Sequence, residues 1–184
     1  MANTPEQIST ALARELVRDG DTDRLIADPR AIDELNQSVI KEFRANQGKV
    51  VGLMEETPDL QALASKLDIL GQPLLLLTMA GAKTGRTLVR PVCYSRDGHR
   101  LVIIASRGGD PRNPPWYYNL VANPVVIVEV GTEKFKARAT ELKGAERDRL
   151  FAEAAKLMPL FADYQNKTKR QIPLLILTRI EGGK

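Results

Sequence analysis

The chain has 184 residues, of which 43% are hydrophobic and 27% charged, as in a soluble globular domain with its own core. It has a single cysteine and a single histidine, so we expect no intrachain disulfide, metal site, Ser-His-Asp triad or Cys-His pair. No apolar run approaches the roughly 20 residues of a membrane-spanning helix, and the N-terminus lacks a signal-peptide pattern. We therefore expect a cytoplasmic protein.

The net charge of +4 is unevenly distributed along the chain. Residues 73–112 carry seven Lys or Arg against two Asp or Glu, whereas residues 1–72 have an excess of acidic side chains. A positive patch of this kind favours an anionic partner, such as a phosphorylated cofactor, a nucleic acid or an anionic lipid surface. Ordinary solvated charges on strands and loops explain the pattern equally well.

The first third of the chain is predicted to be helical. Residues 4–20 and 28–48 each begin with a capping residue and a proline, carry an apolar stripe at helical spacing and end at a glycine. A shorter helix is predicted over residues 57–67. We expect the apolar stripes to serve core packing.

From Gly71 onward the pattern changes to short strands separated by turn signals. Three of the links are of hairpin length, so the sheet is expected to be mainly antiparallel, and six short strands indicate a small barrel. One helix is predicted over residues 116–123, and a longer helical region over residues 144–168 is interrupted by Pro159. The predicted strands cover residues 73–79, 87–95, 100–106, 124–130, 134–142 and 172–180.

The turn after the first strand reads AGAKTGRTLVRP over residues 80–91 and resembles a phosphate-binding P-loop. A P-loop requires a glycine directly before the lysine, and Ala82 stands there. No G-x-G-x-x-G follows a strand, so a Rossmann site is not supported either. Cys93 lies in a predicted strand without an activating base and is interpreted as packing. Few side chains remain for acid–base chemistry, which indicates a binding protein or an enzyme whose cofactor supplies the chemistry.

Three stretches together carry a resemblance to a known family. They are LLLLTMAGAKTGRTLVRPV (residues 74–92), VIIASRGGDPRNPPWYYNLVANP (102–124) and FADYQNKTKRQIPLLIL (161–177). The most specific part is A-S-x-G-G followed by P-x-W-Y-x-N-L-x-A-N-P. Their order and spacing resemble the deazaflavin-dependent nitroreductase family of flavin and deazaflavin oxidoreductases.

This resemblance implies an α+β fold built on a mainly antiparallel, six-stranded split β-barrel with flanking helices. The barrel domain would cover residues 36–184, and residues 1–35 would form an N-terminal helical extension. The implied cofactor is reduced coenzyme F420, a deazaflavin with a phosphodiester and an oligoglutamate tail. It would pass a hydride to a small electron-poor acceptor such as a quinone, a nitroaromatic compound or an enone.

Other interpretations of the barrel stay open. The cofactor could be FMN in place of F420, or the barrel could bind a cofactor or a lipid without catalysis. Nucleic-acid binding is disfavoured because only 5% of the residues are aromatic and the first third of the chain is acidic. The sequence leaves open whether the protein is a monomer or a homodimer, and whether it associates peripherally with a membrane.

The basic hairpin is the predicted site for the anionic tail of the cofactor. Lys83, Arg86 and Arg90 offer charge-assisted contacts to phosphate. Related sequences carry an arginine where this chain has Leu88, so either Arg86 or Arg90 would make the second phosphate contact. The resemblance implies further cofactor contacts from Thr84, Pro91, Val92, Ala105, Ser106, Arg107, Gly108, Gly109, Pro115, Trp116 and Asn119.

Two features of these segments have a physical reason in the sequence itself. Gly108 and Gly109 would let the backbone approach a ligand and present successive N–H groups to an anion. Pro91 within a strand indicates an edge or a bulge. The basic run KTKR over residues 167–170 is expected to be a solvated helix end.

The candidate catalytic residues are Tyr164 and Ser106. The resemblance places Tyr164 as proton donor or as the group that positions the acceptor, and a structural role for this tyrosine is almost as well supported. The acceptor would contact Trp116, Tyr118, Phe161 and Tyr164.

Overall fold

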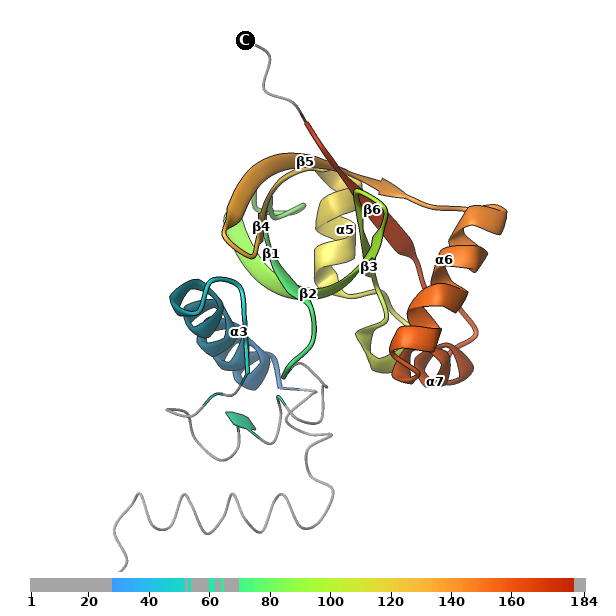
Figure 1. Cartoon of the computed structure of the whole chain (residues 1–184), viewed down its shortest axis with the longest axis horizontal. Helices are drawn as coiled ribbons and strands as arrows, with labels where there is room; N and C mark the ends of the chain where they lie inside the picture. The colour runs from blue at the N-terminus through green and yellow to red at the C-terminus, as the bar shows by residue number, and fades with distance from the viewer. Residues whose placement is uncertain (1–27, 52, 54–59, 62–63, 65–69, 181–184) are drawn as a thin grey trace, which may run out of the picture. The chain divides into compact units, whose positions relative to one another are not determined.

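The computed structural model describes residues 28–51, 53, 60, 61, 64 and 70–180 (Figure 1). The chain divides into two compact units, residues 1–72 and residues 73–184. The domain boundary between residues 35 and 36 stays a prediction.

The first unit contains helix α3, Pro29–Ala45. Asp28 caps this helix, since its side chain accepts a hydrogen bond from the backbone N–H of Arg30 at 2.9 Å. The buried side chains Leu35, Val39 and Phe43 form its apolar stripe. The predicted helix over residues 28–48 is thus confirmed.

The other two helices predicted in this region are not tested. The helix over residues 4–20 lies outside the described residues, and so does most of the one over residues 57–67.

The second unit is a closed barrel of six antiparallel strands in the spatial order β1-β2-β3-β6-β5-β4. The predicted α+β fold and the antiparallel six-stranded barrel are confirmed. The third strand ends before the predicted Ser106, because that residue adopts a helical conformation with φ −72° and ψ −45°. The strands are β1 (Leu74–Ala80), β2 (Thr87–Asp97), β3 (Arg100–Ile104), β4 (Val125–Val130), β5 (Glu133–Glu141) and β6 (Leu174–Arg179).

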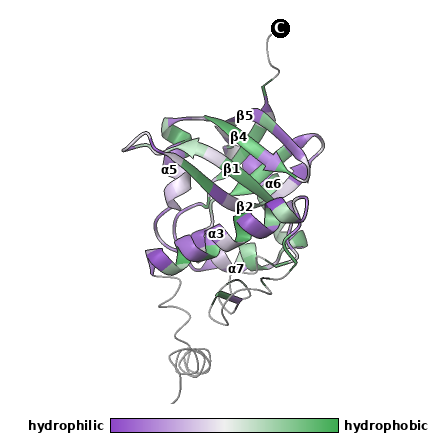
Figure 2. Cartoon of the chain, turned by 90° about the vertical axis from the view of Figure 1, so that its left-hand side faces the viewer, coloured by the Kyte–Doolittle hydropathy of each residue, from purple (hydrophilic) through white to green (hydrophobic). Residues whose placement is uncertain are grey.

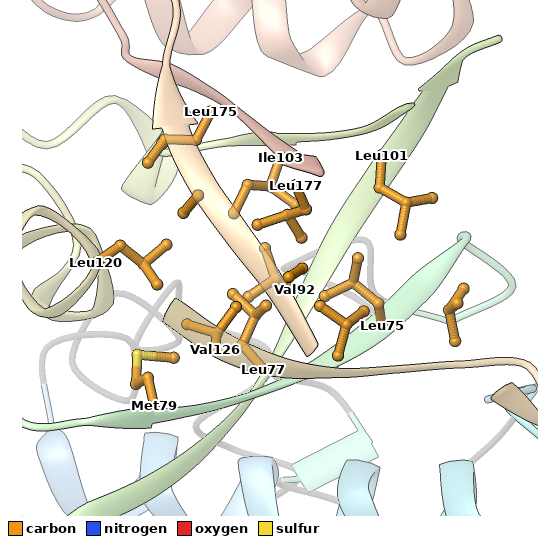
Figure 3. Packing of buried hydrophobic residues seen from close by; sticks show 14 of the residues in the cluster. Leu75, Leu77, Met79, Val92, Leu101, Ile103, Leu120, Val126, Leu175 and Leu177 are labelled. Carbon is orange, nitrogen blue, oxygen red and sulfur yellow. The ribbon is translucent and has the colours of Figure 1, made fainter. Parts of the chain in front are cut away.

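The barrel is filled by alternate residues of its strands and by one helix residue. Figure 3 shows Leu120 of the helix α5 (Pro115–Ala122) extending toward the strand side chains on the side where Met79 lies. Strand β1 is buried along most of its length and is coloured hydrophobic in Figure 2. The interior cluster comprises Leu75, Leu77, Met79, Val92, Leu101, Ile103, Ala105, Leu120, Val126, Val128, Val130, Ala137, Ala139, Leu175 and Leu177.

A second buried group covers the outside of β3 and β6. Helices α6 (Gly144–Leu157) and α7 (Leu160–Asn166) pack there, and they are separated at Pro159 as predicted (Figure 1). The outer cluster comprises Val102, Ile104, Leu142, Leu150, Ala154, Phe161, Ile172, Leu174 and Ile176.

The strand registers bring three connections to one end of the barrel. Because every pair is antiparallel, β1, β3 and β5 end where β2, β6 and β4 begin. The β1–β2 hairpin, the connection with η1 (Arg107–Gly109) and α5, and the connection with α6 and α7 therefore share this end. We call it the helix-bearing end. The β2–β3 turn with the exposed His99 lies at the opposite end.

Pro91 lies in a part of β2 that pairs on one side only. In the part of the chain that the structure describes, β3 pairs with β2 only from Tyr94 onward, so the predicted edge is confirmed. Tyr94 donates its backbone N–H to the carbonyl of Pro73 at 3.0 Å. Because hydrogen-bonded positions alternate along an antiparallel pair, the even-numbered residues of β2 are the ones whose backbone groups bond to β1. The nitrogen of Pro91 therefore faces away from β1, and its missing hydrogen removes no ladder bond.

The described residues contain neither a candidate membrane span nor a candidate metal site. No helix there is long and apolar enough to cross a membrane. No group of three or more His, Cys, Asp or Glu side chains there could hold a metal ion.

Candidate cofactor site at the helix-bearing end

The hairpin tip between β1 and β2 presents positive charge to solvent. Gly81 N–H donates to the carbonyl of Arg86 at 2.8 Å, and the Thr84 hydroxyl accepts from the Arg86 N–H at 3.3 Å. The side chains of Lys83, Thr84 and Arg86 are exposed. Among the described residues neither Lys83 nor Arg86 has an ion-pair partner, so both cations are available to an anion.

Helix α5 fixes this hairpin in place. The side-chain oxygen of Asn119 accepts a hydrogen bond from the backbone N–H of Ala82 at 2.9 Å. Asn123 donates to the carbonyl of Ala80 at 3.5 Å. Asn119, which the family resemblance made a cofactor contact, therefore anchors the segment that carries Lys83.

The turn after β3 forms a concave set of backbone donors. Ser106 is in the right-handed helical region, and Arg107 follows with φ 48°, an alternation that points successive N–H groups toward one anion. The N–H groups of Gly109 and Asp110 are used within the turn, at 3.0 Å to Ser106 and 3.1 Å to Arg107. Those of Arg107 and Gly108 donate to no acceptor in the described part of the chain. The available donors thus lie one residue earlier than the sequence indicated.

Gly109 lets helix α7 pack directly against the backbone of the turn, because glycine has no Cβ atom. A Cβ atom built on it would lie 2.7 Å from the carbonyl oxygen of Tyr164 and 2.9 Å from the Cβ of Lys167. Its φ of 83° also excludes most other residues. Gly109 therefore joins the turn to α7, whereas a Cβ on Gly108 would meet nothing within 4 Å.

Arg170 is a functional candidate that the sequence did not reveal. The KTKR run was expected to be solvated, and Lys167 and Lys169 are exposed. For Arg170 that expectation is wrong, because its guanidinium is half-buried and binds the 106–113 loop. Burial lowers the pKa of Arg170, and the Asp110 carboxylate opposes that shift. No local pattern marks this contact, because it depends on the pairing of β3 with β6.

Arg107 is turned back toward its own loop. Its guanidinium donates to the carbonyl of Asn113 at 3.2 Å and lies 3.7 Å from the Asp110 carboxylate. The backbone N–H of Arg112 is the main group that lowers the pKa of Asp110, and Arg107 adds to it. The side chain of Arg107 thus braces the loop, while its N–H belongs to the donor set.

The aromatic residues of α5 close this end of the barrel. Trp116 and Tyr117 pack against the interior cluster, whereas Tyr118 is 50% exposed. The Tyr117 hydroxyl donates to a Glu141 oxygen of β5 at 2.8 Å. Burial and this bond raise the pKa of Tyr117 to about 12. Tyr117 was not predicted as a site residue, and no sequence signal pairs it with Glu141.

Tyr164 and Phe161 belong to α7. Phe161 is buried in the outer cluster, and the Tyr164 ring packs against that cluster with an edge-to-face contact to Phe161 at 6.4 Å between ring centroids. Lys167 holds its ammonium nitrogen 5.6 Å from the centre of the Tyr164 ring. Tyr164 and Trp116 thus pack against different clusters at the same end of the barrel.

Residues 39–179 match the sequence profile of the F420H(2)-dependent quinone reductase family. The chain belongs to this family. It is therefore an oxidoreductase, and its cofactor is reduced coenzyme F420. The predicted kinship with deazaflavin-dependent reductases is confirmed.

Individual relatives agree with this assignment. The chain is 39% identical over 115 residues to an F420H(2)-dependent quinone reductase of Mycobacterium tuberculosis H37Rv, across 58% of this chain and 74% of that protein. A solved F420-H2-dependent reductase superposes with a TM-score of 0.53 at 39% identity, over 57% of this chain and 93% of that chain. Another solved structure, described as a domain-swapped dimer, gives 0.54 at 38% identity over 59% and 82%.

The residues of the helix-bearing end fit an anionic, aromatic cofactor such as F420. Exposed Lys83 and Arg86 and the N–H groups of Arg107 and Gly108 are all donors, as a phosphodiester requires. Trp116 of α5 supplies an aromatic surface at the same end of the barrel.

The remaining residues expected to contact F420 lie on β2, directly after β3 and on α5. Arg90 is half-buried and donates to the carbonyl of Val89 at 3.0 Å. Val92 is part of the interior cluster, and so is Ala105, whose N–H bonds to Pro173 at 2.9 Å. Pro115 is exposed at the first turn of α5.

Proposed function

We propose that this family member transfers a hydride from reduced F420 to a small electron-poor acceptor, with quinones as the first class and nitroaromatic compounds and enones as further ones. The observation that carries the proposal is the shared position of the cationic hairpin, the backbone donor turn and the α5 aromatics. The strand registers bring all three to one end of the barrel.

The hairpin and the turn would hold the anionic part of the cofactor. Lys83 and Arg86 project from the exposed tip and suit charge-assisted bonds to phosphate and carboxylate. Arg90 is half-buried along the strand and bonds to its own neighbour. Related sequences carry an arginine at the position of Leu88. Arg86 is therefore the better candidate to make the phosphate contact of that arginine. The N–H groups of Arg107 and Gly108 would complete the anion site.

When bound, reduced F420 supplies the hydride, and reduction of a quinone to a hydroquinone consumes that hydride and a proton. The chain's own hydroxyl groups at this end, on Tyr164 and Ser106, are the candidates to hold or deliver this proton. Phe161 would act by packing beneath Tyr164, and Trp116 would exclude water and orient the acceptor.

Three exposed apolar residues on α5 and at the start of β4 support an acceptor of low polarity. Tyr118 and Val121 on α5 and Val125 at the start of β4 are 50%, 58% and 43% exposed. Such exposed apolar residues close to a site suit an apolar ligand or a lipid surface.

Vesicle flotation would test peripheral membrane association, and light scattering would test the homodimer that we expect by analogy with the domain-swapped structure. A cytoplasmic location remains part of the proposal.

One titration tests the function. The purified protein is mixed with F420, FMN or NADPH, and cofactor fluorescence is followed. Saturable binding of F420 alone supports the proposal, whereas binding of FMN alone favours an FMN-dependent barrel oxidoreductase. Binding of F420 without reduction of a naphthoquinone, a nitroimidazole or a cyclohexenone would favour a non-catalytic cofactor-binding barrel.

A further inference from the structure

Arg170 joins three parts of the loop that follows β3. Its NH2 group donates to the carbonyl of Ser106 at 2.6 Å, its Nε to the carbonyl of Asp110 at 2.8 Å, and its NH1 to the side-chain oxygen of Asn113 at 2.8 Å. Arg170 itself comes from the segment between α7 and β6. A planar guanidinium reaches three acceptors in a fixed geometry, which a lysine ammonium does not reproduce.

These bonds hold a turn that the backbone alone disfavours. Arg107 has φ 48°, a left-handed conformation that is unfavourable for a residue with a Cβ atom. The carbonyl of Ser106 accepts hydrogen bonds from both the Arg170 guanidinium and the Gly109 N–H. The start of the turn at Ser106 is therefore bonded both to its end at Gly109 and to Arg170. Without Arg170, the carbonyl groups of Ser106 and Asp110 would lose their charged donor.

We propose that Arg170 is a positioning residue for the cofactor. It preorganises the turn so that the N–H groups of Arg107 and Gly108 point toward one anionic group of F420 before binding. The loop then pays no ordering entropy when the cofactor arrives. This inference rests on the proposed function, because the anion in question is part of F420.

Arg147 provides a matched control for Arg170. It is a buried arginine that donates twice to a backbone carbonyl, that of Ile172, at 2.6 and 3.2 Å. It braces α6 and α7 against the segment before β6 and makes no bond to the 106–113 loop among the described residues. Arg147 also donates to the Gln165 side chain at 3.2 Å, and Gln165 donates to the carbonyl of Arg170 at 2.8 Å. The three bonds from the Arg170 guanidinium to the loop do not involve Arg147. Arg147→Met therefore removes a comparable set of bonds but none that the 106–113 loop itself makes.

The experiment compares Arg170→Met, Arg170→Lys and Arg147→Met with the wild type. Three quantities are measured: amide hydrogen exchange of residues 106–113 without cofactor, the F420 dissociation constant by fluorescence, and the thermal midpoint. For Arg170→Met we expect faster exchange in this loop and about tenfold weaker F420 binding. Arg170→Lys should recover only part of that loss, and Arg147→Met should lower the midpoint while the dissociation constant changes less than about twofold.

The outcomes separate this inference from the proposed function. Unchanged loop exchange in Arg170→Met overturns the inference, as does faster exchange with unchanged F420 affinity. Equal losses of affinity in Arg170→Met and Arg147→Met also overturn it, because they would reflect general destabilisation. If the wild type does not bind F420, the proposed function fails. Loop exchange then still decides whether Arg170 positions the turn.

Discussion

Asn119 accepts the backbone N–H of Ala82 at 2.9 Å and thereby joins helix α5 to the tip of the β1–β2 hairpin. The two residues are 37 positions apart, so this bond depends on the tertiary fold. The bond links the exposed lysine of the hairpin to the helix whose aromatic residues close the barrel end. Asn119, a predicted cofactor contact, thus sets the position of the hairpin that we propose binds the cofactor.

Asn119→Ala should release the hairpin without unfolding the barrel. We expect a loss of about 1 kcal/mol in the free energy of unfolding, since one hydrogen bond is removed, and F420 binding weaker by several fold. Urea unfolding and fluorescence titration measure the two effects. Asn123→Ala is the control, because its contact to Ala80 is longer at 3.5 Å and lies further from the tip. A smaller effect of Asn119→Ala than of Asn123→Ala would contradict the anchoring role.

Lys83→Gln should weaken F420 binding and reduce the dependence of that binding on salt. The side chain is exposed, so the free energy of unfolding should stay within about 0.5 kcal/mol of the wild type. Lys136→Gln removes the same charge from an exposed position on the outside of β5 and should leave both properties unchanged. The hairpin assignment is wrong if the two variants show the same affinity and salt dependence.

The sequence was sufficient for features determined by local chemistry. Asp28 before a proline marked the start of α3, and Pro159 marked the break between α6 and α7. The switch from helical spacing to short apolar runs indicated the six strands. The edge position of Pro91 followed from its missing N–H.

Contacts that form only when the barrel closes could not be predicted from the sequence. Arg170 looked like part of a solvated basic run, because nothing nearby shows that β6 starts beside the end of β3. The pairing of Tyr117 with Glu141 likewise depends on α5 covering the barrel end. Gly109 was interpreted as room for a ligand, although the space beside it is taken by α7. Each of these depends on residues distant in sequence.

Gly109→Ala should lower the free energy of unfolding much more than Gly108→Ala does. Both residues have positive φ, 83° and 63°, so both variants carry backbone strain of about 1 kcal/mol. Only the Gly109 variant adds a clash with the backbone of α7, at 2.7 Å from the carbonyl oxygen of Tyr164. We expect it to lose about 2 kcal/mol more than the Gly108 variant in urea unfolding. Equal losses would mean that α7 moves aside freely.

Tyr164→Phe should slow turnover while F420 affinity stays near that of the wild type. The variant keeps the aromatic ring and its packing on Phe161 and removes only the hydroxyl group. If that hydroxyl supplies the proton, we expect a fall in kcat of about 10²-fold, the lower range for a general acid. Single-turnover and steady-state rates with a quinone measure it, with fluorescence titration for binding. An unchanged kcat would return Tyr164 to a packing role.

Comparing Tyr117→Phe with the wild type should show that Tyr117 makes the free energy of unfolding depend on pH above pH 10. The folded protein raises the pKa of Tyr117 from 10.0 to about 12, chiefly through burial and through the bond to Glu141. The folded state therefore holds this proton more tightly than the unfolded state. The stabilising contribution is complete below pH 10 and is lost as the pH rises toward 12.

Relative to the wild type, Tyr117→Phe should be less stable by about 1 kcal/mol near neutral pH, because Oε2 of Glu141 loses the donor that Tyr117 supplies. The gap should narrow between pH 10 and about 12, where the unfolded wild type gives up the phenolic proton first. Urea unfolding of both proteins across this range measures the gap directly. A gap that stays constant up to the highest pH would contradict the raised pKa, because Tyr117 would then lose its proton at the same pH in the folded and unfolded states.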